Sequence, residues 1–145
     1  MSNVEDFLSA EEEQEIIAAI RTAEQQTSGE IRVHIEDHAA IDHFERALEV
    51  FHLLKMDNTK LRNGVLIYVA VRDRQFVICG DEGINSVVPK DFWNTTRDAM
   101  RAQFQQGNFT QGLIEGVLKA GKELQQHFPW DVDDVDELSN EISKG

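Results

Sequence analysis

Apolar residues recur every three to four positions in four stretches of the chain, the spacing of a helix with one buried face. The first predicted helix covers about residues 10–27 and begins at a capping box formed by Ser9 and Glu12. A second helix is predicted over about 42–55. The last two are predicted from Asp91 to a break at 107–108, and from the capping residue Thr110 to Pro129.

Three other stretches have strand patterns. Residues 30–36 alternate between apolar and polar positions, and residues 65–71 are continuously apolar, as in a strand buried on both faces. Residues 75–79 follow after a three-residue turn, so these two strands form an antiparallel hairpin. Residues 86–88 could add a short edge strand. The order of elements predicts an α/β fold, a three-layer α/β/α sandwich whose mixed sheet of about four strands carries helices on both faces.

Composition limits the classes of partner. The chain has 145 residues, which suits a single domain, expected over 1–130 and followed by an acidic C-terminal tail, 131–145. The formal net charge of −13 argues against a nucleic acid or an anionic membrane as partner, and it permits cations. The single cysteine excludes an internal disulfide. With no signal-peptide pattern and no long apolar run, we expect a soluble, cytoplasmic protein of bacterial type.

The predicted topology brings polar segments together at one edge of the sheet. A right-handed crossover makes the first two strands parallel, and the third strand runs back. The end of the third strand then lies beside the starts of the other two. Segments 28–30, 57–63 and 80–85 meet there, with Asp91 close behind. The acidic residues expected at this edge are Glu30, Asp57, Asp81, Glu82 and Asp91.

Close carboxylates repel one another unless a proton or a cation neutralises them. Ligands that are all oxygen favour Ca²⁺ or Mg²⁺ over zinc, and Gly80 and Gly83 would let the backbone turn around an ion. This edge is therefore a candidate metal site. In the alternative interpretation Asp81 and Asp91 are turn and cap residues, and the other acids face water.

Several segments resemble the TPM domain family over about residues 5–130. They are Phe7-Leu8-Ser9, the runs 28–33, 63–68, 80–84 and 91–93, and Phe104 with Gly107, Phe109 and Gly112-Leu113. The resemblance implies an α/β/α sandwich and a divalent cation, usually calcium, at loops on one sheet edge. Glu30, Asn63, Asp81, Glu82 and Asp91 fall on matching motifs, and Asp57 lies in the matching loop. Some members are described as acid phosphatases of the thylakoid lumen. The exported or anchored members often carry a glycine-rich tail, which this chain lacks.

Other catalytic patterns fit poorly. A cysteine phosphatase needs an arginine after five intervening residues, and Asn85 stands at that position, so we expect Cys79 to be a core residue. The run 131–135 matches the aspartate-nucleophile pattern of haloacid-dehalogenase phosphatases. That pattern must follow a strand and precede a large α/β domain, and here it follows Pro129-Trp130 with only ten residues after it. His34, His38 and His43 lack zinc-site spacing, and we expect His34 to be exposed or half-buried.

Three functions remain open from the sequence. The first is a regulatory calcium-binding module in which the ion orders two loops at the sheet edge. The second is a metal-dependent acid phosphatase. It rests on family analogy, because no nucleophile or general base stands out, and enzymatic activity stays undecided. The third is a scaffold that binds an unidentified protein partner through its tail, where apolar residues recur between 132 and 142.

Overall fold

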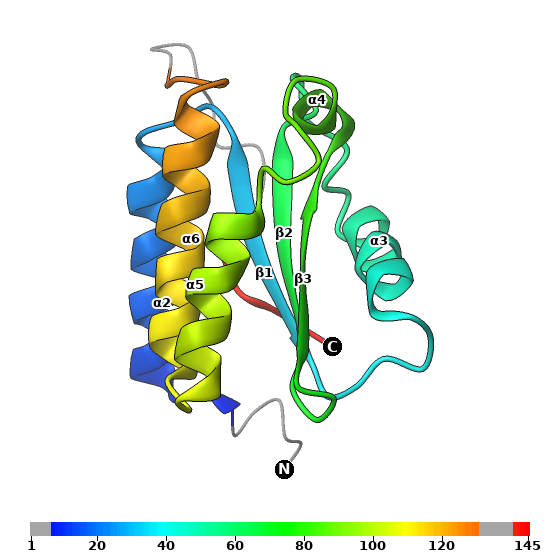
Figure 1. The fold of residues 1–145 in the computed structure, drawn as a ribbon, viewed down its shortest axis with the longest axis vertical. Coiled ribbons are helices and arrows are strands. Elements are labelled where there is room, and N and C mark those ends of the chain that lie inside the picture. The colour runs from blue at the N-terminus through cyan, green and yellow to red at the C-terminus, as the bar shows by residue number, and fades with distance from the viewer. Residues whose placement is uncertain (1–6, 131–140) are drawn as a thin grey trace.

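A four-stranded mixed sheet with the strand order β3-β2-β1-β4 forms the centre of the molecule. The computed structural model describes residues 7–130 and 141–145 (Figure 1). The elements, in chain order, are α2 (Ala10–Glu24), β1 (Glu30–Glu36), α3 (His43–Leu53), β2 (Gly64–Ala70), β3 (Gln75–Gly80), α4 (Glu82–Asn85), α5 (Asn94–Gln105), α6 (Phe109–Gln125) and β4 (Ser143–Lys144).

Strand pairing confirms the predicted crossover and hairpin. β1 lies parallel to β2 in a register that opposes Glu30 to Gly64, and β3 runs antiparallel to β2 with Gly80 opposite Val65. The fourth strand was predicted at the wrong place. Residues 86–88 lie outside the sheet, and Val87 is 51% exposed. The fourth strand is instead β4, which pairs in parallel with His34 and Ile35 of β1.

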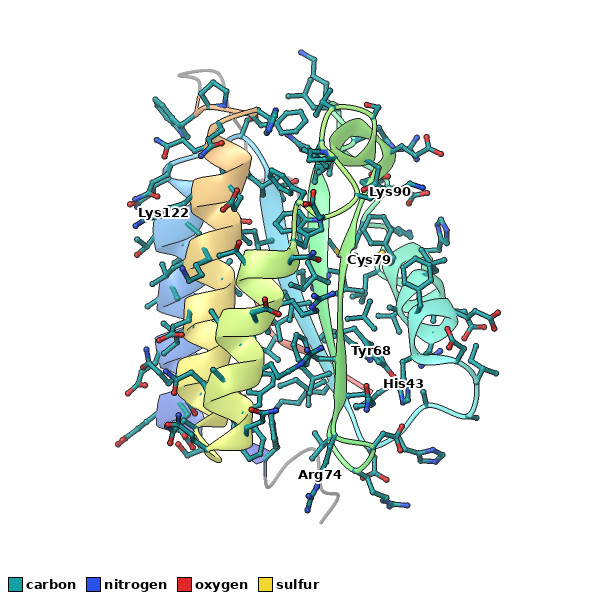
Figure 2. The ribbon with its side chains drawn as sticks, in the orientation of Figure 1. His43, Tyr68, Arg74, Cys79, Lys90 and Lys122 are labelled. Atoms are coloured by element: carbon teal, nitrogen blue, oxygen red, sulfur yellow. The ribbon has the colours of Figure 1, made fainter. Side chains whose placement is uncertain are left out.

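Helices cover both faces of the sheet, as predicted: α2, α5 and α6 lie on one face and α3 on the other (Figure 1). The alternation along β1 sends Ile31, Val33 and Ile35 into the larger core beneath α2 and α6. The opposite face of the sheet packs against α3 through a smaller core that includes Tyr68 and Cys79. Both residues lie in the layer between sheet and α3 (Figure 2). Cys79 is buried, as expected.

The predicted helix starts are partly right. Ser9 and Glu12 form the capping box of α2, and the Asp42 side chain caps α3. Asp91, however, does not begin α5, because residues 89–94 form turns in which Phe92 N donates to Pro89 O and Asn94 N to Asp91 O. Thr110 does not cap α6 either. Its hydroxyl donates to the Glu12 carboxylate of α2, and Asn108 holds the N-cap position.

Two glycines of α6 allow close packing of this helix against its neighbours. A Cβ atom at Gly121 would lie 2.7 Å from the Ala23 Cβ of α2, and one at Gly116 would lie 2.4 Å from the Met100 Sδ of α5. Glycine costs a helix roughly 1 kcal/mol against alanine. The contacts of α6 with α2 and α5 explain why glycine is kept.

The chain end contributes to the sheet. Of the predicted tail, the structure describes 141–145, where β4 adds to β1 and Gly145 N donates to Ile35 O at 2.9 Å. The run 131–135 and most of the apolar positions proposed for partner binding lie outside the described residues. Among the described helices, none is long and apolar enough to cross a membrane.

Candidate functional site

Three polar segments meet at one edge of the sheet, where the topology predicted them. Glu30 N, at the start of β1, donates to Asn63 O at 3.4 Å. Asp81 N, just after β3, donates to Gly64 O at 3.0 Å, and Gly83 N donates to Arg62 O at 2.8 Å. The loop 57–63 is therefore fastened to both β1 and α4 by main-chain hydrogen bonds.

Asp81 is a buried acid of this edge with defined partners on both carboxylate oxygens. It is 4% exposed, and its Oδ1 accepts from Glu82 N at 2.7 Å, which makes it the N-cap of the short helix α4. Its Oδ2 accepts from Arg62 Nε at 3.2 Å. A buried carboxylate needs such partners to stay ionised. The backbone of α4 thus fixes one side of the carboxylate and Arg62 the other.

Arg62 holds the positive charge of the site. Its backbone has φ 52°, in the left-handed region that non-glycine residues rarely occupy. Its guanidinium also lies 3.6 Å from the Glu82 carboxylate. The hydrogen bond and charge of Asp81, followed by the charges of Glu82 and Asp57, raise the pKa of Arg62. Three carboxylates of the predicted set therefore act on one arginine.

Gly83 allows the close approach of the loop to α4. A Cβ atom at this position would lie 2.1 Å from Leu61 O and 2.5 Å from Arg62 O, both main-chain atoms. Gly80 differs, because its nearest contacts would be ordinary van der Waals distances of 3.5 Å or more. The close main-chain contact therefore requires glycine at position 83 and not at position 80.

The remaining predicted ligands lie farther from Asp81. Asn63 is 2% exposed, and its side-chain amide donates to Ser28 Oγ at 3.3 Å. Glu30 is buried at the start of β1, two strand spacings or about 10 Å of backbone from Asp81. Asp57 pairs with His52 at 3.4 Å. Asp91 is exposed in the turn before α5. The structure therefore gathers Asp81 and Glu82 directly on Arg62, with Asp57 acting on it electrostatically.

The donor types at this edge suit a hard divalent cation. Carboxylate and carbonyl oxygens are the ligands that Ca²⁺ and Mg²⁺ prefer. In residues 7–130 and 141–145, no group of three or more histidine, cysteine or acidic side chains is placed to hold a metal ion. In this structure the Arg62 guanidinium supplies the positive charge that neutralises Asp81.

A second polar cluster, which the sequence analysis missed, lies inside the sheet–α3 layer. Glu36 is 4% exposed, and Arg46 of α3 reaches it with two hydrogen bonds, Nε to Oε2 at 2.9 Å and Nη2 to Oε1 at 3.0 Å. Tyr68 Oη donates to Oε2, and His34 Nε2 lies 2.9 Å from Oε1. The signal was available in the sequence. A sheet covered on both faces leaves no solvent side, so the polar positions of β1 must be buried.

Burial and hydrogen bonding set the charges of this cluster. Burial raises the pKa of Glu36, but the hydrogen bonds from Arg46, Tyr68 and His34 outweigh it and bring the pKa to about 2. Burial lowers the pKa of His34, whose 5% exposure corrects the expectation of an exposed or half-buried ring. The cluster therefore holds an ionised carboxylate against an arginine and a neutral imidazole at pH 7.

The chain end lies over this cluster. Ser143 Oγ is 3.0 Å from His34 Nδ1, and a Cβ atom at Gly145 would lie 2.8 Å from His34 Nε2. Lys144 pairs with Glu13 of α2. β4 is thus held by both side chains and main chain.

A mixed α/β/α sandwich with acidic loops at one sheet edge defines the class of this domain. The sequence profile of the TPM domain matches residues 1–123, and the chain belongs to the TPM domain family.

Solved structures agree with this assignment. The NMR structure of the BA42 protein from the psychrophilic bacterium Bizionia argentinensis is 65% identical, with a TM-score of 0.93 over 100% of both chains. The N-terminal domain of a P. gingivalis protein (22% identity, TM-score 0.69) covers 84% of this chain and 79% of its own. The N-terminal domain of the Corynebacterium glutamicum cg2496 protein has 13% identity and a TM-score of 0.64. The match covers 95% of this chain and 80% of that one. These two likenesses show the fold alone. A search of curated proteins gave no significant match.

Proposed function

We propose that this domain binds a hard divalent cation, Ca²⁺ or Mg²⁺, at the sheet edge, with Asp81 as the anchoring ligand. The observation that carries the proposal is the Asp81–Arg62 pair: a carboxylate 4% exposed, held in place by a helix cap, faces a guanidinium whose side chain is 43% exposed. The exposed Arg62 side chain can turn to water when an ion takes its place, whereas Asp81 stays fixed by its helix cap. Family membership supports the same function.

Asp81 and Glu82 would hold the ion, and the loop that carries Asp57 and Asn63 would have to move toward Asp81 to bring further oxygen ligands to it. The Glu82 side chain is 83% exposed and free to turn toward Asp81. The ion would supply two positive charges where Arg62 supplies one. Because two charges neutralise the edge more fully, loop 57–63 and the segment 80–91 would be better ordered with the ion than without it.

The test is a titration of metal-free protein with Ca²⁺ and with Mg²⁺, followed by calorimetry and by amide NMR shifts. We expect shifts confined to 57–63 and 80–91, and their loss in Asp81→Asn. Arg62→Gln removes the competing charge and should tighten binding by about tenfold, which corresponds to roughly 1.4 kcal/mol. Arg72→Gln is the matched control, because Arg72 pairs with Asp37 outside this edge.

Two results would contradict the proposal. One is the absence of heat and of shifts in these segments. The other is weaker binding in Arg62→Gln than in the parent, which would mean that Arg62 supports the site instead of competing for it. Hydrolysis of phosphate esters by the metal-loaded protein, lost in Asp81→Asn, would extend the function to a phosphatase.

A further inference from the structure

A second candidate binding site lies at the opposite end of the molecule from the sheet edge. In Figure 2, Arg74 of the β2–β3 turn marks this end and Lys90 marks the other. A pocket of about 650 Å³ opens here between the hairpin turn and the α5–α6 turn. This volume lies within the range of small-molecule sites, about 300–1,000 Å³.

Four phenyl rings form a continuous apolar wall of the pocket. Phe7 and Phe109 have centroids 4.8 Å apart, Phe109 and Phe104 5.8 Å, and Phe104 and Phe76 5.1 Å. These three contacts join the N-terminal segment, helices α5 and α6, and the β2–β3 hairpin. Phe109 remains 40% exposed, so the row is open to a ligand. Such a wall suits an aromatic or acyl group, which gains by leaving water.

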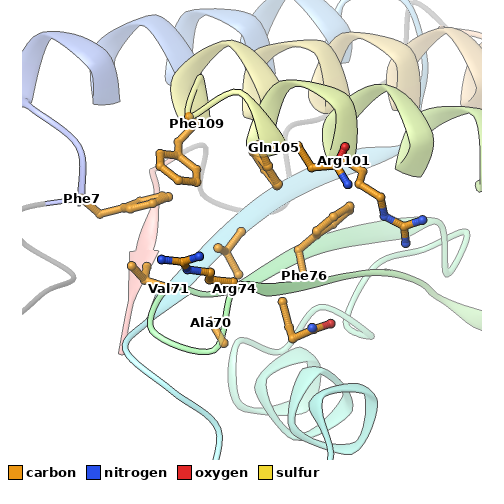
Figure 3. A pocket seen from close by; sticks show the side chains of 12 residues that line it. Phe7, Ala70, Val71, Arg74, Phe76, Arg101, Gln105 and Phe109 are labelled. Atoms are coloured by element: carbon orange, nitrogen blue, oxygen red, sulfur yellow. The ribbon is translucent and has the colours of Figure 1, made fainter.

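Two arginines complete the pocket, Arg74 from the hairpin turn and Arg101 from α5 (Figure 3). Neither forms an ion pair with any residue that the structure describes. Their neighbours in sequence differ: Arg72 pairs with Asp37 at 2.5 Å and Arg97 with Asp98 at 3.6 Å. Two arginines that have no acidic partner among residues 7–130 and 141–145 lie beside one pocket, and their charge favours an anionic ligand.

The backbone at Arg74 adds a local argument. Arg74 has φ 55°, and its N–H donates to Val71 O at 3.2 Å, which closes the hairpin turn. Glycine or asparagine occupies this left-handed position most easily. An arginine here places a strained backbone beneath a side chain that lines the pocket, and strain of this kind often accompanies binding sites.

We propose that this pocket binds a small organic carboxylate, with its aromatic or acyl body against the phenyl row and its carboxylate paired with Arg74 or Arg101. Apolar burial would provide most of the affinity, and the arginines would select an anion over a neutral molecule of the same shape. The site is independent of the cation-binding edge.

The probe is 8-anilinonaphthalene-1-sulfonate, an aromatic anion that fluoresces when it leaves water, added to the folded full chain in metal-free buffer. Decanoate should displace it at least tenfold more effectively than decanol, and decyltrimethylammonium should not displace it below its micelle concentration. Binding should weaken as salt increases. Amide shifts caused by decanoate should fall in 69–76 and 101–109.

Two matched pairs of variants test the arginines. Arg74→Gln and Arg101→Gln should together weaken decanoate binding by tenfold or more, and the larger single effect identifies the partner of the carboxylate. Arg72→Gln on the same turn and Arg97→Gln on the same helix should change binding less than twofold. All four positions are on the surface, so circular dichroism should show an unchanged fold.

Three outcomes would overturn the proposal. Equal displacement by decanol and decanoate would show an apolar surface without anion selection. Unchanged affinity in the Arg74→Gln, Arg101→Gln double variant would place the anion elsewhere. Probe binding that disappears as the protein concentration rises would mean that a second copy of the chain covers the phenyl row.

Discussion

Tyr68 Oη donates a hydrogen bond of 2.5 Å to Glu36 Oε2 between neighbouring strands, beneath α3. The hydroxyl, the Arg46 guanidinium and the His34 ring together surround a carboxylate that water barely reaches. Burial raises the pKa of Tyr68, and the hydrogen bond to Glu36 adds to the effect, so the phenol keeps its proton across the physiological range. A charge in the core is thus stabilised by donors from β1, β2 and α3, which ties the three elements together.

Glu36→Gln should make the protein less stable at neutral pH. The pKa of Glu36 is about 2 in the folded state against 4.5 for an ordinary glutamate, so ionised Glu36 stabilises the fold above pH 4.5. That contribution is lost as pH falls from about 4.5 toward 2, because protonation favours the unfolded state. The shift corresponds to roughly 3 kcal/mol. Urea unfolding measured from pH 7 to pH 3 should show parent and variant converging below pH 4.5.

The matched control for this prediction is Glu49→Gln. Glu49 contacts the same arginine at 3.4 Å, but its side chain is 55% exposed, and exposed pairs contribute little. We expect a loss below about 1 kcal/mol, with a pH dependence like that of the parent. Unfolding curves of Glu36→Gln that stay parallel to those of the parent down to pH 3 would refute the prediction.

Gly83→Ala should destabilise the domain by about 1–3 kcal/mol, the usual cost of forcing atoms into a packed site. The new methyl would meet the main-chain oxygens of Leu61 and Arg62, which cannot rotate away as a side chain can. Gly80→Ala, three residues earlier, should change stability by less than about 1 kcal/mol, because its Cβ would make ordinary contacts. Thermal and urea unfolding of both variants check this.

Amide NMR of the two glycine variants shows whether the loop 57–63 moves, independently of any change in the free energy of unfolding. In Gly83→Ala, amide shifts should spread through 57–63, since the loop has to move away from α4. Equal stability of the two variants would show that the loop yields freely. That result would contradict our inference that the hydrogen bond from Gly83 N to Arg62 O holds the loop rigidly against α4.

Cys79 should react slowly in the native protein. Burial, and to a lesser degree the charge of Asp81, raises the pKa of its thiol to about 11, and the residue is 4% exposed. Near pH 8 the thiolate fraction alone should slow reaction with a disulfide reagent roughly 100-fold relative to an exposed cysteine. Full reactivity should return in concentrated guanidinium. Rapid labelling of the folded protein would mean that β3 opens readily from α3.

Strand positions were predictable because their signals are local. The alternation over 30–36 and the apolar run after Gly64 gave β1 as observed and β2 to within a residue at each end. The starts of α5 and α6 were wrong because tertiary contacts overrode local capping preferences: the Thr110 hydroxyl binds Glu12 on another helix. β4 could not be seen locally, since two residues gain strand geometry only from their pairing with β1.

The acidic edge was predictable in outline. Topology and the glycine-bounded loop placed Asp81 and Glu82 at this edge, beside the loop 57–63 that carries Arg62. Charge counting could not show that Arg62 pairs with Asp81, because that pairing depends on side-chain direction. The separation of Glu30 from Asp81 follows from the predicted strand order, in which the central strand lies between them. The Glu36 cluster was missed because the polar positions of β1 were interpreted as a solvent face. The predicted helices on both faces of the sheet already implied that these positions are covered.

The pairing of His34 with Ser143 has a consequence for the order of folding. The two residues are 109 positions apart, so their contact closes a loop that spans most of the chain. Closing so long a loop costs entropy, whereas β1, β2 and β3 can assemble from nearer partners. We therefore expect β4 to join last and to detach first, before the rest of the sheet opens. Hydrogen exchange at Gly145 N should then be faster than at the amides of β2.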